Sequence, residues 1–198
     1  MPNIARTLMD SDEFLHWCLD QDDRYELVEG IPVKMMTGAS NRHDQIIVNV
    51  IIALGQQLRG TGYRPATADI AVKTRIRSIR RPDVTVTCDP PSKDTYDAAT
   101  PKMVVEVLSP SNRGIAWQRK LEEYRNRDGL IYILIVESDA PAAILLTRLP
   151  GMREWTDTDV DGLDATIELP EINCRLPMSD LYAEIDFTAE FPPHLPEG

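Results

Sequence analysis

Two carboxylates interrupt apolar segments in the middle of the chain. Asp83 stands in Arg-Pro-Asp-Val-Thr-Val at 81–86, and Glu106 stands in Lys-Met-Val-Val-Glu-Val-Leu at 102–108. A carboxylate within an apolar β-strand is costly unless a cation, a proton or hydrogen bonds compensate it. If the two segments pair in one sheet, Asp83 and Glu106 come together, and converging carboxylates are typical ligands of Mg²⁺ or Mn²⁺.

Each carboxylate also has a purely structural interpretation. Asp83 follows a proline and could begin a strand, while Glu106 could face solvent or pair with a nearby arginine. Isolated carboxylates on strands are mostly solvated. The prediction of a metal site therefore depends on the pair, together with the segment that follows it.

A helix is predicted directly after the Glu106 strand. Ser111 or Asn112 can cap it, and it runs to about residue 127. Lys120 lies beside its apolar stripe, so the helix could aim the ammonium group at the two carboxylates. The alternative is a surface lysine whose stem covers apolar side chains while its ammonium stays in water. The stripe consists of Trp117, Leu121 and Tyr124.

Six short segments share a pattern with one bacterial family. They are Tyr-Glu-Leu-Val-Glu-Gly at 25–30, Asn-Arg-His-Asp-Gln-Ile at 41–46, Pro-Asp-Val at 82–84, Val-Val-Glu-Val-Leu-Ser-Pro-Ser at 104–111, Lys-Leu-Glu-Glu-Tyr-Arg at 120–125 and Ile-Tyr-Ile-Leu-Ile-Val-Glu at 131–137. With these pieces the chain resembles the Uma-type endonucleases, within the restriction-endonuclease-like PD-(D/E)XK nuclease superfamily. The resemblance covers residues 10–185, and Glu-Val-Leu-Ser-Pro-Ser is its more specific piece.

The resemblance implies roles for the matching positions. Asp83 and Glu106 would be the acidic metal ligands, joined by the backbone carbonyl of Val107. The usual Glu-X-Lys pattern would place the lysine at position 108, where this chain has Leu108. In the family that the chain resembles, the lysine is displaced to the following helix, and Lys120 matches that position.

Three further positions bear on the expected site. Ala116 stands where related sequences often carry an acidic residue, one turn before the lysine. Glu26 could approach the cleft as an additional acidic residue, or it could remain a carboxylate on an edge strand. His43 could be an exposed or capping histidine, whereas the resemblance gives it a position near the cleft.

The net charge of −11 argues against casual nucleic-acid binding, which usually needs a basic footprint. One segment is an exception, because it holds five cations within nine residues and no acidic residue between them. The cations are Lys73, Arg75, Arg77, Arg80 and Arg81. This run could contact a phosphate backbone beside the metal site. It could equally be the solvated edge of a hairpin, because positive charges also blunt sheet edges.

Hydrophobic periodicity predicts a mixed α/β (α+β) domain. Helices are expected over 12–20, 40–59 and 112–127, with a short closing helix over 178–184. Strands are expected over 25–29, 31–36, 68–73, 83–88, 103–108, 130–136 and 143–148, with an outer hairpin over 153–169. The expected architecture is a restriction-endonuclease-like central mixed β-sheet flanked by helices.

The remaining features fit one cytoplasmic domain. The chain has 198 residues, and we expect a single nuclease-like domain over 1–190 and a flexible Pro-rich tail over 191–198. No apolar run approaches the ~20 residues that a membrane helix needs, and the start of the chain lacks a secretory layout. Its cysteines, Cys18, Cys88 and Cys174, show neither metal nor disulfide spacing, which favours a reducing compartment.

These features predict a metal-dependent endonuclease that hydrolyses DNA phosphodiester bonds with Mg²⁺ or Mn²⁺. Lys120 would orient the attacking water or stabilise the transition state. The alternative is a catalytically inactive nuclease-fold module with a binding or regulatory role, which the acidic net charge and Ala116 favour. DNA is the expected partner, no membrane is expected, and a homodimer is left open.

Overall fold

The computed structural model describes residues 8–35, 40–109 and 113–187. The expected tail over 191–198 and the expected helix caps Ser111 and Asn112 lie outside these ranges. Within the ranges, the strands form sheets of six, four and two strands. No helix in them combines the length and the apolar character that crossing a bilayer requires.

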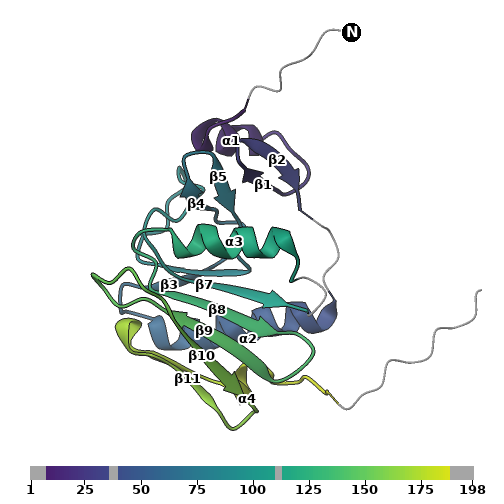
Figure 1. Ribbon diagram of the computed structural model, residues 1–198, viewed down its shortest axis with the longest axis vertical. Coiled ribbons are helices and arrows are strands. Elements are labelled where there is room, and N and C mark those ends of the chain that lie inside the picture. Colours follow the sequence, from purple (N-terminus) through teal and green to yellow (C-terminus); the bar gives the residue numbers. More distant parts are fainter. Residues whose placement is uncertain (1–7, 36–39, 110–112, 188–198) are drawn as a thin grey trace, which may run out of the picture.

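A mixed sheet of six strands forms the centre of the molecule (Figure 1). Its strands are β3 (Arg64–Thr67), β6 (Val84–Thr87), β7 (Pro101–Leu108), β8 (Tyr132–Glu137), β9 (Ala142–Thr147) and β10 (Thr156–Asp161). They follow the order β10-β9-β8-β7-β6-β3, in which β7 and β8 are parallel and the other neighbours are antiparallel. Helix α3 (Ile115–Arg125) connects β7 to β8, because a parallel pair needs a crossover connection.

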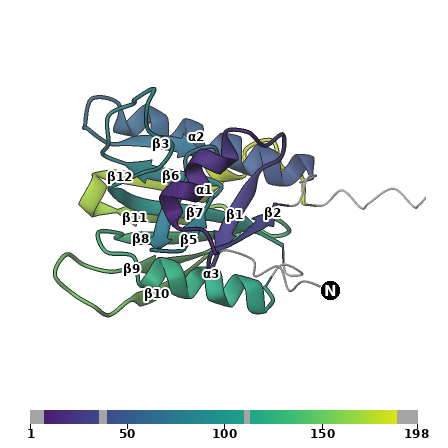
Figure 2. The same cartoon turned by 90° about the horizontal axis from the view of Figure 1, so that it is seen from above.

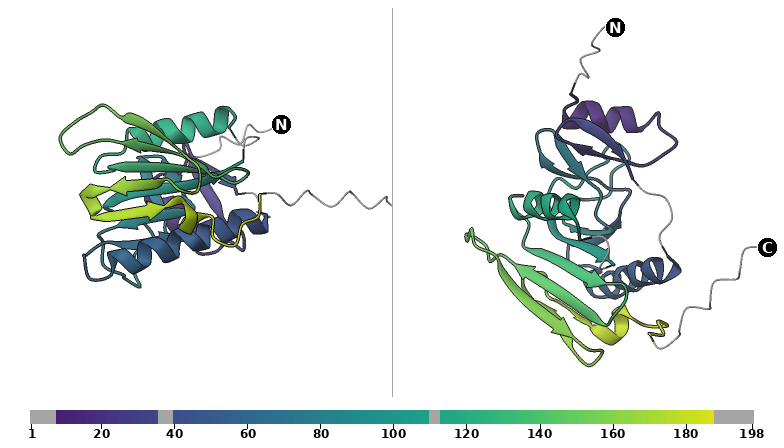
Figure 3. Two further views of the ribbon diagram at one scale, coloured as in Figure 1. Left: turned by 90° about the horizontal axis from the view of Figure 1, so that it is seen from below. Right: turned by 45° about the vertical axis from the view of Figure 1, so that its right-hand side comes forward.

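Strand β7 presents its two faces to two different helices. Helix α2 (Asn41–Leu58) and α3 lie on opposite sides of the central sheet (Figures 2 and 3). The α2 face of β7 carries Met103, Val105 and Val107, and the α3 face carries Val104 and Leu108. Because side chains alternate along a strand, Glu106 belongs to the face that points toward α3.

A second sheet of four strands lies near the N-terminus, above α3 in Figure 1. It contains β1 (Tyr25–Val28), β2 (Ile31–Lys34), β4 (Val72–Arg75) and β5 (Ser78–Arg80) in the order β2-β1-β5-β4. Helix α1 (Ser11–Cys18) covers one face, where Leu27 and Ile79 are completely buried. Glu26 and Arg80 are the neighbours of these core residues, so they point to the opposite face, toward α3.

The last described elements close the α2 side of the central sheet. They are β11 (Thr166–Leu169), the 3₁₀ helix η2 (Pro170–Ile172), β12 (Cys174–Pro177) and α4 (Met178–Leu181). Strands β11 and β12 pair antiparallel, and their apolar side chains join the core beneath α2. This half of the core holds the long helix that carries His43.

The expected mixed α/β fold with a central mixed sheet is confirmed, with corrections to the strands. Residues 153–169 do not form a hairpin, because β10 pairs with β9 whereas β11 pairs with β12. The strand expected over 68–73 begins only at Val72, after the turn that follows β3. The sequence pattern does not predict β3 because it contains Pro65, which is tolerated there because β3 is an edge strand.

Candidate active site

Lys120 reaches from α3 to two carboxylates that come from different sheets. Its Nζ lies 2.7 Å from Glu106 Oε1 and 3.3 Å from Glu26 Oε1. The side chain is only 16% exposed, so the interpretation of Lys120 as a surface lysine is wrong. The structure brings together the carboxylate and the lysine that the sequence places fourteen positions apart.

Glu106 is buried, with 4% of its surface exposed, and one of its oxygens accepts two donors. Besides the contact of Oε1 with Lys120, the hydroxyl of Tyr124 donates to the same oxygen at 2.6 Å. Burial raises the pKa of Glu106 to about 7, although Lys120 opposes the rise; the negative charge of Asp83 adds to it. Glu106 therefore changes its charge near neutral pH.

Lys120 and Tyr124 keep their protons at any pH near neutrality. Burial alone would lower the pKa of Lys120, but the charges of Glu106 and Glu26 outweigh it and raise the pKa above its ordinary value. Burial raises the pKa of the Tyr124 hydroxyl well above its usual range, and Glu106 raises it further. The site thus contains a fixed cation and a fixed hydrogen-bond donor around one titrating carboxyl group.

Asp83 lies next to Glu106 because β6 and β7 are neighbouring antiparallel strands. It does not belong to a strand, as the sequence suggested, but occupies a bend directly before β6. Its Oδ2 accepts the backbone N–H of Val107 at 2.8 Å. Strand β6 begins at Val84, which pairs with Val105, so this contact lies just outside the β6–β7 ladder. The side chain of Asp83 therefore extends the hydrogen bonding of β7 past the end of β6.

His43 reaches the same place from the first turn of α2. Ser40 caps this helix by accepting the N–H of His43 at 3.2 Å. His43 Nε2 lies 3.6 Å from Asp83 Oδ2. Hydrogen bonding to Asp83 raises the pKa of His43 against the effect of burial, and the backbone of Val107 adds to the rise. The imidazole Nδ1 is buried and has no hydrogen-bond partner among the described residues.

A cleft of about 690 Å³ opens beside Asp83 and His43. Ile47, Val48 and Ile51 of α2 form an apolar wall. Besides Asp83, four further aspartates line the cleft, namely Asp22, Asp23, Asp44 and Asp69. Apart from His43, Arg24 is the basic residue among those that line the cleft.

Glu26 belongs to the site as a charge partner of two cations. Arg80 Nη1 donates to its Oε2 at 2.9 Å, and Lys120 lies near its other oxygen. Burial would raise the pKa of Glu26, but Lys120 and then Arg80 outweigh it and lower the pKa below its ordinary value. Glu26 is therefore ionised at neutral pH, whereas Glu106 titrates there.

The basic run is divided by the fold, and two of its members need correction. Arg80 and Arg81 are only 4% and 9% exposed. The Arg80 guanidinium binds Glu26 and Glu123, and that of Arg81 donates to the backbone carbonyl of Asp69 at 2.7 Å, among others. Both guanidinium groups are buried and bind partners within the protein, so the prediction of phosphate contacts is wrong for Arg80 and Arg81.

The other three cations of the run lie nearer the surface. Lys73 pairs with Asp12 at 2.9 Å, whereas Arg75 and Arg77 are exposed beside the turn between β4 and β5. Arg75 Nη2 lies 3.5 Å from Glu122 Oε1, a distance at the limit of a hydrogen bond. A phosphate contact stays a prediction for these three positions.

Sequence reasoning assigned no function to Glu123 and Tyr124. Both lie on the face of α3 that carries Lys120, at spacings of three and four positions, which is where helical neighbours meet. That spacing was the available signal. A glutamate on the buried side of a helix needs a cation, and Arg80 provides it.

The mixed sheet between α2 and α3 is a fold already known from a solved structure. That structure is described as a "putative nuclease belonging to DUF820" from Anabaena variabilis ATCC 29413. The two structures align with a TM-score of 0.66 over 87% of this chain and 97% of the other chain. Because their sequences are 16% identical, the likeness shows a shared fold.

The chain belongs to the Uma2 family, described as "Putative restriction endonuclease", whose family model matches residues 11–179. A curated relative from Synechocystis sp., "Uncharacterized protein slr1290", is 30% identical over 188 residues. This match covers 94% of the chain and 97% of the relative. The family resemblance that the six sequence segments indicated is therefore confirmed.

Proposed function

We propose that this protein is a divalent-metal-dependent endonuclease that hydrolyses phosphodiester bonds in DNA. The observation that carries the proposal is the contact of 2.7 Å between Lys120 Nζ and Glu106 Oε1, beside the neighbouring carboxylate of Asp83. Membership of a family described as "Putative restriction endonuclease" supports the same reaction.

The oxygen atoms at this site fit Mg²⁺ or Mn²⁺. Mg²⁺ is usually bound by one or two carboxylates and keeps several waters. Asp83 and Glu106 would hold it, together with the carbonyl of Val107. The N–H of Val107 donates to Asp83, and the carbonyl of an extended residue leaves on the same side of the strand as its N–H. No cluster of three or more His, Cys, Asp or Glu side chains suited to a metal occurs in the described ranges, so the Val107 carbonyl and water molecules would have to complete the coordination.

The balance of charge also favours a cation. Among the described residues, four carboxylates and two permanent cations meet at this site, and His43 adds a third positive charge when it is protonated. The carboxylates are Glu26, Asp83, Glu106 and Glu123, and the cations are Arg80 and Lys120. A divalent cation beside Asp83 and Glu106 would offset the excess of negative charge. When bound, it would activate a water molecule and neutralise charge that develops on the phosphate.

The protein side chains have distinct roles in this proposal. Lys120 acts as a fixed positive charge and not as a base, because its pKa is raised. It would orient the attacking water or stabilise negative charge in the transition state. Tyr124 holds the Glu106 carboxylate in one orientation through its hydroxyl. His43, when protonated, would compete with the metal for Asp83, so its neutral form is the one that favours metal binding.

The experiment that tests this function is cleavage of varied DNA and RNA substrates with Mg²⁺ or Mn²⁺. We expect the wild type to cut DNA and the Asp83→Ala variant to be inactive. Equal cleavage by both proteins would remove Asp83 from the reaction and point to a contaminating nuclease. Cleavage confined to RNA would replace the substrate class but keep the site.

A second candidate function is a nuclease-fold module that binds or regulates without turnover. The acidic lining of the cleft favours it, because four aspartates surround the approach to Asp83. The net charge of −11 points in the same direction. Binding of nucleic acid or metal without cleavage of any substrate would favour this function over the endonuclease.

A further inference from the structure

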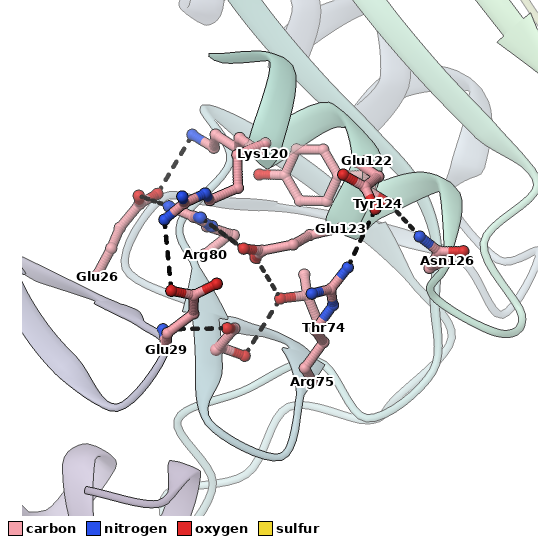
Figure 4. Close-up of polar contacts among 12 residues, drawn as sticks. Glu26, Glu29, Thr74, Arg75, Arg80, Lys120, Glu122, Glu123, Tyr124 and Asn126 are labelled. Atoms are coloured by element: carbon pink, nitrogen blue, oxygen red, sulfur yellow. Dashed lines mark hydrogen bonds and ion pairs between the residues drawn. The ribbon is translucent and has the colours of Figure 1, made fainter. Parts of the chain in front are cut away.

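Lys120 is part of a ring of polar contacts, and Figure 4 shows most of the members of this ring. In order, the contacting residues are Glu123, Arg80, Glu26, Lys120, Glu106 and Tyr124. Glu123 and Tyr124 are consecutive in the chain, so α3 itself closes the ring. We infer that Arg80 is a positioning residue that holds Lys120 against Glu106, a role that rests on the proposed endonuclease function.

Arg80 links β5 to both α3 and β1. Its Nε and Nη2 donate to the two oxygens of Glu123 at 2.8 and 2.7 Å, and its Nη1 donates to Glu26 at 2.9 Å. Such a paired contact fixes orientation as well as distance, which a lysine cannot reproduce. Thr74 Oγ1 also donates to Glu123 at 2.8 Å, so the carboxylate is held from two strands.

Glu123, which Arg80 binds, and Lys120 lie on the same side of α3. Lys120 and Glu123 are three positions apart, so their side chains leave one face of the helix. Glu123 is 1% exposed, and without Arg80 its charge would be buried and unpaired. The contact at Glu123 therefore fixes α3 about one turn from the point where Lys120 meets Glu106.

Arg80 also biases the competition between two carboxylates for Lys120. Glu106 lies closer to the ammonium than Glu26 does, at 2.7 against 3.3 Å. Glu26 already accepts hydrogen bonds from the Arg80 side chain and from the backbone N–H of Arg81, at 2.9 and 3.1 Å. Because these donors offset the charge of Glu26, the ammonium stays nearer to Glu106. Without Arg80, we expect Lys120 to turn toward Glu26.

The direct test is NMR of the lysine ammonium groups in the full chain with and without the substitution Arg80→Lys. The chain contains five lysines, so the Lys120 signal can be identified with the variant Lys120→Met. We expect the chemical shift and exchange protection of the Lys120 ammonium to change. We expect kcat for DNA cleavage to fall roughly tenfold or more, with KM within about twofold, because a small displacement of a catalytic group is costly.

Arg148→Lys is the matched control. Arg148 donates to the backbone carbonyls of Arg125 and Leu130, at 3.0 and 3.2 Å, and so holds the C-terminal end of α3 through contacts that lie outside the ring. The control should reduce thermal stability, but it should leave the Lys120 signal and kcat unchanged. Glu123→Gln is the second variant, because it removes the partner of Arg80 without adding a lysine, and it should act like Arg80→Lys.

The outcomes separate this inference from the proposed function. An unchanged Lys120 signal in Arg80→Lys and Glu123→Gln overturns the positioning role, as does a loss of kcat no larger than that of Arg148→Lys. Loss of folding in both variants makes Arg80 a structural residue and also overturns it. If the wild type cuts no nucleic acid, the proposed endonuclease function is wrong. The NMR signal of the Lys120 ammonium then still tests whether Arg80 positions Lys120 against Glu106.

Discussion

Lys120 and Tyr124 lie one turn apart on α3 and contact the same oxygen of Glu106, at 2.7 and 2.6 Å. Burial raises the pKa of Glu106 to about 7, and these two donors limit the rise. The charge of Glu106 near neutral pH therefore depends on both. Metal binding at this site should depend on them too, because a carboxylate binds a cation only when it is deprotonated.

Removal of the Tyr124 hydroxyl should weaken metal binding without unfolding the protein. In Tyr124→Phe, Glu106 loses a donor to its charged form, so its pKa rises and Mn²⁺ affinity at pH 7 falls. The free energy of unfolding should fall by about 1.5–3 kcal/mol, the scale of one hydrogen bond to a charged group. Calorimetry and urea denaturation measure the two effects. Tyr132→Phe is the control, since the Tyr132 hydroxyl accepts the N–H of Glu171 away from the site. Equal Mn²⁺ affinity in all three proteins would contradict the prediction.

Glu106→Gln should weaken Mn²⁺ binding by roughly 10–100-fold or more. Loss of a residue that only orients a metal ligand typically costs 10–100-fold, and loss of a ligand should cost at least as much. The amide keeps the shape of the side chain but removes the charge that the cation needs. Isothermal titration calorimetry of the wild type and the variant measures the change. Glu168→Gln, on the exposed face of β11, is the charge-matched control and should bind like the wild type. Unaltered binding by Glu106→Gln removes Glu106 from the metal site.

The same carboxyl group should make the stability of the metal-free protein depend on pH. Folded Glu106 has a pKa of about 7 against an ordinary value of 4.5, so the folded state holds this proton more tightly. The free energy of unfolding contributed by Glu106 therefore falls as pH rises from 4.5 toward 7. Denaturation of the wild type and Glu106→Gln across this window isolates the effect. A difference between the two proteins that does not vary with pH would be inconsistent with a raised pKa.

The exposed arginines beside the β4–β5 turn should carry the contact with DNA, if the basic run has that role. Replacing Arg75 and Arg77 with Ala should weaken DNA association and flatten the log–log salt dependence by about 0.9 for each lost phosphate contact. Fluorescence anisotropy over a series of salt concentrations measures both quantities. The double variant Arg59→Ala with Arg153→Ala removes the same charge from other exposed positions. Equal effects of the two pairs would reduce the role of the run to net charge.

The position of the site could be predicted from the sequence because it follows from local rules. Side chains alternate along a strand, so Glu106 lies on the face of β7 that does not carry Val105 and Val107. The connection between two parallel strands is usually a helix, which places α3 after β7. Together with the family resemblance, these rules were enough to predict that Lys120 lies near Asp83 and Glu106. The bend at Asp83 was not visible, because the same residues also fit the first position of a strand.

The sequence could not predict which cations of the basic run are exposed, because exposure depends on partners that are distant along the chain. Arg80 and Arg77 look alike in sequence, yet one is buried and the other is exposed. The difference comes from Glu123, which lies 43 positions away from Arg80 along the chain and pairs with it only after α3 has packed. The sequence suggested a row of surface cations, whereas the fold uses Arg80 and Arg81 to hold its parts together.

The most direct test of the catalytic role of Lys120 is single-turnover DNA cleavage with Mg²⁺ by the wild type, Lys120→Met and Arg119→Met. Methionine keeps an apolar stem and removes the ammonium, so folding should be largely retained. Arg119 precedes Lys120, points about 100° away on an ideal helix and is half exposed near Glu29. We predict that Lys120→Met lowers the rate by roughly 10²-fold or more and that Arg119→Met cuts like the wild type. Wild-type cleavage by Lys120→Met, or loss of activity in Arg119→Met alone, would contradict it.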